Sequence, residues 1–283
     1  MYKFTPILKI LVWGTENWAL SGVPGSESVV ADGPEAGRTL CEVYGGEFPL
    51  LIKFIEAHRD LSIQVHPDDA LAAARHNCKG KSEMWYVTGA SGDARLYSGL
   101  SKEITREEYV RSVKDGSITG YLASYRVAPG DVFFIPAGRI HSICGGCSLV
   151  EIQETSDITY RIYDYNRPGL DGKPRQLHTE LAEDAIDFTV SDDYRTHYRH
   201  RENAAVELVE CAQFTTVLFD LTAPLSCAAP GVGRWLAVAC AGGAGTVNGA
   251  ALRAGEALLL TPDEKELRLV PEGPSLKLLV SYC

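Results

Sequence analysis

A glutamine and a histidine stand two residues apart in a segment that alternates polar and apolar residues. Gln64 and His66 alternate with the apolar residues Ile63 and Val65. Successive side chains of a strand point to opposite faces, so Gln64 and His66 share a face with Ser62. Buried polar groups need partners, and a metal ion or a ligand is one way to supply them. For this segment alone, a polar strand face that is exposed to solvent is the simpler explanation.

A second segment places a histidine at the end of a tight turn. Val132–Ile135 is an apolar run, and Pro136, Gly138 and then His141 follow it. We expect the run to be a buried strand and the proline–glycine segment to be a turn. The turn returns His141 to the start of the next strand, aimed inward.

A third segment supplies a carboxylate and an amine. Gly80–Val87 predicts a strand on which Lys81, Glu83 and Trp85 share one face. A glutamate on a strand is more often exposed to solvent. A functional role for Glu83 therefore depends on the spacing of the neighbouring motifs and on the face that it shares with Trp85. Lys81 can equally be a solvated surface lysine or a member of the site.

The Gly-x5-Pro-x-Gly-x2-His pattern that ends at His141 resembles the second motif of the cupin superfamily. Gly145 stands where an asparagine often follows that histidine. The His-x-His of the first cupin motif is replaced by Gln64-Val65-His66. The resemblance implies a mainly β protein with two jelly-roll (cupin-like) β-sandwich or barrel domains and a few short helices.

The departure from the first cupin motif resembles the type I phosphomannose isomerases, especially their short bacterial branch. Gln64-x-His66-Pro, Lys81-x-Glu83 and the later Asp157–Arg167 carry the likeness. The metal of that family is zinc, so the resemblance implies one Zn²⁺ per chain. Carried over by position, the ligands are Gln64, His66, Glu83 and His141.

The same resemblance implies an isomerase that interconverts mannose 6-phosphate and fructose 6-phosphate through a cis-enediol. Arg161 matches the catalytic arginine of the family, and Lys81 matches a lysine that acts in proton transfer. Both are also expected to bind substrate, and Ser62 is a candidate for the phosphate. Asp164 is a further acid/base candidate, although an aspartate in such a stretch is more often a structural acceptor.

The charge of the expected metal site agrees with this chemistry. Zinc accepts imidazole nitrogen and carboxylate oxygen in a roughly tetrahedral site. Two neutral imidazoles, one amide and one carboxylate leave a zinc site with a surplus positive charge. That surplus suits a transition state in which negative charge grows on the oxygens of an enediolate.

The 283 residues are enough for one large or two modest domains. We expect a catalytic metal-binding domain over residues 1–200, with a connecting helix, and a cupin-like β-sandwich over residues 201–283. His200 is the last histidine, so the second domain cannot hold a histidine-based metal site. Its short alternating strands include residues 235–239, 245–247, 267–270 and 276–280, and Asn248-Gly249 is a strong hairpin signal.

Two further segments predict local structure, one a loop and the other the start of a helix. Gly14–Gly37 is rich in glycine, serine, proline and acidic residues, and it predicts an ordered loop over the site. Thr105 and Glu108 form a capping box that opens a helix ending near Gly116.

Composition limits the partners and the compartment. The net charge of −10 argues against nucleic acid or an anionic membrane as a partner. No apolar run approaches the roughly 20 residues of a membrane span, and the first residues lack a signal-peptide pattern. The eight cysteines are scattered, as expected for free thiols in a reducing cytoplasm. We therefore expect a cytoplasmic protein, a monomer or homodimer, and the family resemblance implies a small hexose 6-phosphate as its partner.

Three alternatives stay open. Two histidines and one carboxylate also form the iron(II) triad of cupin oxygenases, although Gln64 as a fourth ligand disfavours the open positions that oxygen needs. A non-catalytic sugar-phosphate-binding cupin is the second alternative, disfavoured by Lys81 and Arg161. Cys144 and Cys147 could join a zinc knuckle, but a lone Cys-x2-Cys fits small core residues better.

Overall fold

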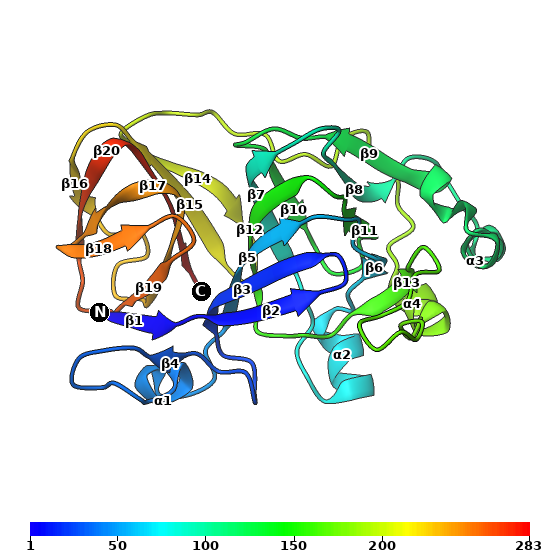
Figure 1. The fold of residues 1–283 in the computed structure, drawn as a ribbon, viewed down its shortest axis with the longest axis horizontal. Coiled ribbons are helices and arrows are strands. Elements are labelled where there is room, and N and C mark those ends of the chain that lie inside the picture. The colour runs from blue at the N-terminus through cyan, green and yellow to red at the C-terminus, as the bar shows by residue number, and fades with distance from the viewer. The chain divides into compact units, whose positions relative to one another are not determined.

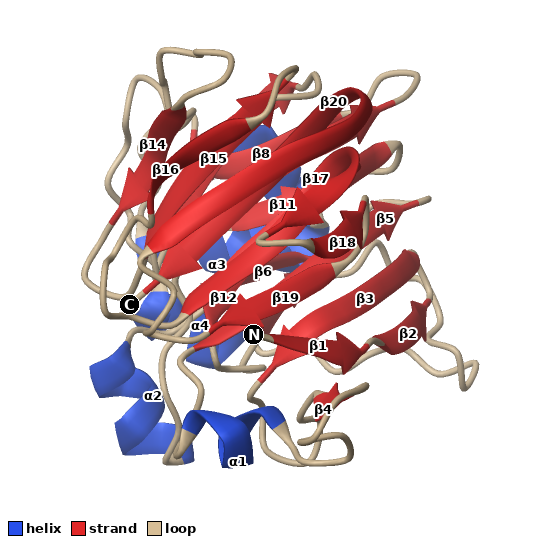
Figure 2. Cartoon of the chain, turned by 90° about the vertical axis from the view of Figure 1, so that its left-hand side faces the viewer, coloured by secondary structure: helices blue, strands red, loops and turns tan.

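The computed structural model describes all 283 residues, and strands dominate it (Figure 2, red). The chain forms β1–β20, the helices α1–α4 and one short 3₁₀ segment. The prediction of a mainly β, cupin-like protein with a few short helices is confirmed.

Contacts divide the chain into two compact units. The first contains Met1–Leu8, Asn17–Phe54 and Thr196–Cys283, and the second contains Lys9–Glu16 and Ile55–Arg195. This grouping follows contacts alone. The assignment of a catalytic domain to residues 1–200 and of a second domain to 201–283 stays a prediction.

The first unit is built on a nine-stranded antiparallel sheet of order β14-β15-β20-β17-β19-β1-β4, with β16 paired to β20 and β18 to β17. The N-terminal strand β1 lies beside β19, although the two are distant in sequence (Figure 1). The bounds of its elements are β1 Tyr2–Thr5, β4 Val29–Val30, α1 Leu40–Tyr44, β14 Ala205–Glu210, β15 Thr215–Leu221, β16 Leu225–Ala228, β17 Leu236–Val247, β18 Ala250–Arg253, β19 Ala257–Leu260 and β20 Glu266–Tyr282.

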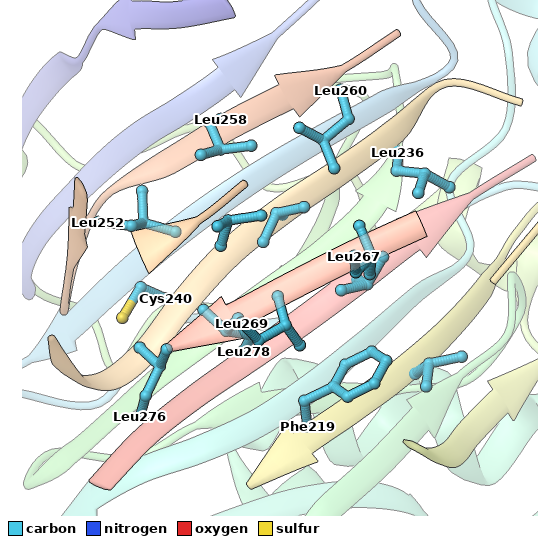
Figure 3. Packing of buried hydrophobic residues seen from close by; sticks show 14 of the residues in the cluster. Phe219, Leu236, Cys240, Leu252, Leu258, Leu260, Leu267, Leu269, Leu276 and Leu278 are labelled. Carbon is cyan, nitrogen blue, oxygen red and sulfur yellow. The ribbon is translucent and has the colours of Figure 1, made fainter. Parts of the chain in front are cut away.

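A leucine-rich core fills one face of this sheet. Figure 3 shows leucines of β17–β20 pointing toward one another, with Phe219 of β15 beside them. The hairpin prediction is confirmed, since Asn248 and Gly249 have φ values of 49° and 85° and join β17 to β18. The prediction of separate strands at 235–239 and 245–247 is wrong, because β17 absorbs the intervening glycines as register shifts and stays continuous. The two strands predicted at 267–270 and 276–280 are likewise one, β20.

The second unit contains a five-stranded sheet of order β13-β6-β11-β8-β9. It also contributes to a six-stranded sheet of order β10-β7-β12-β5-β3-β2, in which β2, β3 and β5 have residues in both units. The strands are β2 Ile7–Leu11, β3 Gly14–Ser21, β5 Leu50–Ala57, β6 Ile63–Val65, β7 Glu83–Ala90, β8 Arg95–Leu100, β9 Leu122–Arg126, β10 Val132–Ile135, β11 His141–Ile143, β12 Cys147–Glu154 and β13 Tyr160–Tyr163.

Three helices belong to the second unit: α2 Asp69–His76, α3 Arg106–Asp115 and α4 Thr179–Ala185. The predicted capping box is present, because Thr105 and Glu108 each accept a hydrogen bond from the backbone of the other. Residues of α3 and α4 share an apolar cluster with Ile63 and Val65 of β6. Helices therefore cover one face of the five-stranded sheet, and Gln64, between those two residues, points to the other face.

That other face carries a second apolar cluster, which determines where polar side chains can gather. Trp85 and Phe133 of the six-stranded sheet pack there with Leu96 and Ile143 of the five-stranded sheet. Moving two residues along the same strand keeps a side chain on the same face. Glu83, Ser98 and His141 therefore continue the faces of Trp85, Leu96 and Ile143, and the apolar core ends in a polar region.

The expectation of an irregular loop over Gly14–Gly37 is wrong for its first third. Gly14–Ser21 is the strand β3, with Trp18, Ala19 and Leu20 buried. After Gly14, glycines and prolines occur only from Gly22 onward. In that part Val29–Val30 forms the short strand β4. Only Thr15 and Trp18 of this strand are types that favour β structure, so pairing with β5 and β2 forms the strand where local propensity does not predict it.

We expect Gly138→Ala to destabilise the protein more than Gly92→Ala. Both glycines have positive φ (89° and 61°), which costs an alanine about 1 kcal/mol. A Cβ at position 138 would also lie 3.0 Å from the Ala185 carbonyl oxygen, whereas position 92 is open. Gly138→Ala should therefore cost about 2–3 kcal/mol, including the contact. Urea unfolding of both variants measures the difference, and equal losses would contradict it.

Candidate metal centre

Three side chains from three strand ends meet in the second unit. His66 directly follows β6, Glu83 begins β7 and His141 begins β11. Their candidate ligand atoms all lie within 4.8 Å of one another, and each residue is at most 1% exposed. The turn predicted between β10 and β11 is present, and within it the Gly138 N–H donates to the His66 carbonyl (2.9 Å). The structure therefore brings together three of the four residues expected to bind metal.

Backbone carbonyls fix the orientation of both imidazoles by accepting from Nδ1, the ring nitrogen that faces away from Glu83. His66 Nδ1 lies 2.9 Å from the Ile158 carbonyl oxygen, and His141 Nδ1 lies 2.8 Å from that of Arg139. A carbonyl can only accept, so each Nδ1 carries the proton and donates it. Each Nε2 then presents a lone pair toward Glu83, which is the arrangement of metal-bound histidines.

Glu83 supplies the negative charge of the cluster. Its Oε2 lies 2.6 Å from Lys81 Nζ and 3.5 Å from His66 Nε2, and its Oε1 lies 3.4 Å from His141 Nε2. Burial by itself raises the pKa of this carboxyl. The charge of Lys81 is the largest of the opposing effects, and together they hold the pKa well below its ordinary value. Glu83 is therefore ionised.

Both histidines are neutral. Burial, followed by the charge of Lys81, lowers the pKa of His66 to about 3. Burial also lowers the pKa of His141. Two neutral imidazoles and one ionised carboxylate, all shielded from water, form a donor set that suits a divalent metal ion. The Lys81 ammonium lies against the same atoms, which shows that the cluster attracts positive charge.

Gln64 lies beside this cluster, in a row across the five-stranded sheet. The register pairs Arg161 with Gln64, Gln64 with His141, and His141 with Ser98. Residues directly opposite on neighbouring strands share a face, so all four side chains lie on the metal-site face. The Gln64 amide is 3.2 Å from His141 Nε2, and its Oε1 accepts from the buried Ser62 hydroxyl (3.3 Å). Ser62 therefore contacts the fourth expected ligand.

Two polar residues of this region escaped the sequence analysis. Glu151 of β12 is buried, accepts from Trp85 Nε1 (2.9 Å) and lies 3.9 Å from Lys81. The hydroxyl of Ser98 is buried and has no hydrogen-bond partner. A carboxylate inside the apolar strand Cys147–Glu154 was a usable signal for Glu151. A single serine on a strand gives no comparable signal.

Arg161 and Asp164 lie around the end of β13. Arg161 donates to the Gln176 carbonyl (2.9 Å), and its buried Nε has no partner. Asp164 accepts from Arg167 and Arg175. Burial alone raises the pKa of Asp164, but these two arginines outweigh burial and lower it. Its contacts favour a positioning role over proton transfer, and the acid/base role stays a prediction.

Cys144 and Cys147 are buried free thiols outside the ligand cluster. Burial raises the pKa of both thiols, which disfavours the thiolate that metal binding needs. Cys147 packs in the apolar cluster of Trp85, as expected of a small core residue. The helices of the structure include none with the length and apolar character of a membrane span.

Comparison with known proteins decides the family. Residues 15–82 match the family model described as phosphomannose isomerase type I, catalytic domain. Mannose-6-phosphate isomerase ManA of Bacillus subtilis is 32% identical over 253 residues, which cover 79% of this chain and 80% of that protein. The chain belongs to the type I phosphomannose isomerase family. The family predicted from the motifs is confirmed, and with it the class of aldose–ketose isomerases.

Further similar proteins include one more curated relative and two solved structures. The probable mannose-6-phosphate isomerase GmuF of B. subtilis is 39% identical over 193 residues, or 64% of this chain and 61% of that protein. A crystal structure of mannose 6-phosphate isomerase from B. subtilis superposes with a TM-score of 0.90 at 28% identity, covering 100% of this chain and 99% of that one. A mannose 6-phosphate isomerase crystallised with zinc and yttrium shares the fold (TM-score 0.74, 15% identity, 100% and 99% covered).

We expect bound metal to be retained when the pH falls from about 7 to about 5. The pKa of His66, lowered to about 3, keeps its imidazole neutral across this range, so protons do not compete for its Nε2, and burial lowers the pKa of His141 as well. The carboxylate of Glu83 also stays ionised. Dialysis at each pH followed by elemental analysis measures the retained metal. Loss with a midpoint near the ordinary histidine pKa of about 6.5 would contradict the prediction.

Proposed function

We propose that the protein interconverts mannose 6-phosphate and fructose 6-phosphate, with one Zn²⁺ bound by Gln64, His66, Glu83 and His141. The observation that supports this most is the buried His66–Glu83–His141 cluster with Lys81 against it, in a chain of this family. Zinc is supported by the donor set and by its presence in a solved relative. Gln64 would join through Oε1 after its amide turns, and amide orientation is a matter of assignment.

The bound zinc would supply a Lewis acid for the sugar oxygens at C1 and C2. The protein supplies what surrounds them. The carbonyls behind His66 and His141 hold both imidazoles in one orientation, and the apolar cluster around Trp85 excludes water from one side. A dry site with fixed dipoles strengthens every charge interaction inside it.

The proton moved in this reaction passes between C2 and C1, and a cis-enediol lies between the two sugars. Lys81 is our candidate for moving it, because its Nζ lies 3.0 Å from His66 Nε2 and is buried in the site. Arg161 stands in the same row as Gln64 and His141, and its buried Nε is free to donate. We assign it the stabilisation of negative charge that develops on the sugar oxygens.

Ser62 and Asp164 have more indirect roles in this proposal. The Ser62 hydroxyl lies 3.3 Å from the end of the Gln64 side chain and can accept from the amide N–H once the amide has turned, so we assign Ser62 the positioning of that amide in addition to its predicted contact with phosphate. Asp164 anchors two arginines. The cytoplasmic location and the monomeric or dimeric state stay predictions.

Glu83→Gln should lose metal and activity together. The substitution removes the only negative charge among the proposed ligands and leaves the cluster without its attraction for a cation. Elemental analysis and a coupled assay with mannose 6-phosphate test this. The exposed Glu103→Gln is the matched control and should keep both properties. Full turnover by Glu83→Gln would show that the ligand assignment is wrong.

Lys81→Met should separate metal binding from catalysis. We expect zinc content to be retained, because Lys81 is not a proposed ligand, and turnover to fall about 10²–10⁴-fold, as when an acid/base group is removed. Elemental analysis and the same coupled assay measure the two effects. Wild-type turnover would exclude a catalytic role for this lysine.

A further inference from the structure

An arginine cluster surrounds Asp164 at the end of β13. Asp164 accepts a fork of two hydrogen bonds from Arg175 (2.7 and 2.6 Å) and two more from Arg167 (3.0 and 2.8 Å). The Asp164 side chain is only 5% exposed, against 15% for Arg167 and 20% for Arg175. One carboxylate therefore holds two half-buried guanidinium groups.

A third guanidinium adds to the same charge. The Arg161 guanidinium donates to the carbonyl of Gln176, the residue after Arg175 (2.9 Å), and the charges of Arg175 and Arg167 add to burial in lowering its pKa. Three arginines against one aspartate leave a surplus of two positive charges. A partly buried surplus of charge is costly unless an anion compensates it.

The cluster keeps donors available after Asp164 is satisfied. Arg167 and Arg175 both use Nε and Nη2 for Asp164, and neither uses Nη1 within the protein. The Nε of Arg161 is buried without a partner. Guanidinium groups held in a fixed plane with free N–H groups are the protein's usual means of binding phosphate.

The backbone at the cluster is strained in a way that holds Arg167 in place. Tyr165 and Asn166 both have positive φ, 56° and 53°, and the Arg167 N–H donates to the Asp164 carbonyl (3.2 Å). This turn carries Arg167 back onto Asp164, and the guanidinium also stacks over the Tyr165 ring (5.6 Å). A tyrosine in the left-handed region is uncommon and is retained where structure or function requires it.

Arg161 is the arginine of this group that lies in the row leading to the metal centre. Arg161 is directly opposite Gln64, which is opposite His141. Neighbouring strands are about 4.8 Å apart, so Arg161 is two strand spacings, roughly 10 Å, from His141. A six-carbon sugar that reacts at C1 and C2 presents its phosphate at the opposite end, toward Arg161 and the arginines beyond it.

We infer that Arg167 and Arg175, anchored by Asp164, bind the phosphate group of the substrate. The inference rests on the proposed function for the identity of the sugar but not for the binding of phosphate. A phosphate monoester carries a charge of about −2 at neutral pH, which balances the surplus of the cluster. Arg161 then lies between the phosphate and the reacting carbons.

Titration calorimetry with inorganic phosphate tests the site without requiring turnover. The proteins are zinc-loaded wild type, Arg175→Gln, Arg175→Lys and the control Arg75→Gln, which removes an arginine paired with one aspartate elsewhere in the unit. Losing a charged contact to phosphate should weaken phosphate binding about tenfold or more in Arg175→Gln, less in Arg175→Lys, and not in the control. Circular dichroism confirms that each variant is folded, and Arg167→Gln replaces Arg175→Gln if that variant is not.

Steady-state kinetics with mannose 6-phosphate give the second readout. In Arg175→Gln we expect KM to rise about tenfold or more, in parallel with the loss of phosphate affinity. Wild-type phosphate affinity in both glutamine variants, or no binding of phosphate by the wild type, would overturn the arginine site. A wild type that binds phosphate through these arginines without isomerising mannose 6-phosphate would overturn the proposed function and leave the site standing.

Discussion

The metal centre depends on two lone pairs that are forced to face one buried carboxylate. The tautomers of His66 and His141 are fixed, because a main-chain carbonyl accepts a hydrogen bond from the Nδ1–H of each ring. Burial then keeps the rings neutral, and positive neighbours keep Glu83 ionised. The polar cluster is thus stable only as a set, since removing one member would leave the charge of another uncompensated.

The local sequence predicted much of the fold and the segments that form the buried polar cluster. Alternating polarity and a proline–glycine turn were enough to place Gln64, His66 and His141 on one face, and the capping box at Thr105 was found as expected. These signals depend only on neighbours along the chain. These local signals could not predict that β17 and β20 are continuous strands. Pairing within the sheet keeps each strand extended through glycines that locally favour a turn.

Residues that matter through long-range contacts were harder to find. Arg175 reaches Asp164 from a loop eleven residues away, and Glu151 meets Lys81 only because β12 pairs with β7. Neither contact has a spacing in the sequence that would indicate it. The family resemblance supplied Arg161, whereas composition and periodicity alone would have left it among the other charged residues of its segment.

The main-chain origin of the histidine partners has a consequence for how this site can change. In many metal centres a side chain orients each imidazole, so a single substitution can rotate a ligand. Here the orienting groups belong to Ile158 and Arg139 as backbone atoms, and every residue type supplies the same oxygen. Evolution, or a protein engineer, can therefore vary the side chains at both positions while the geometry offered to the ion is preserved.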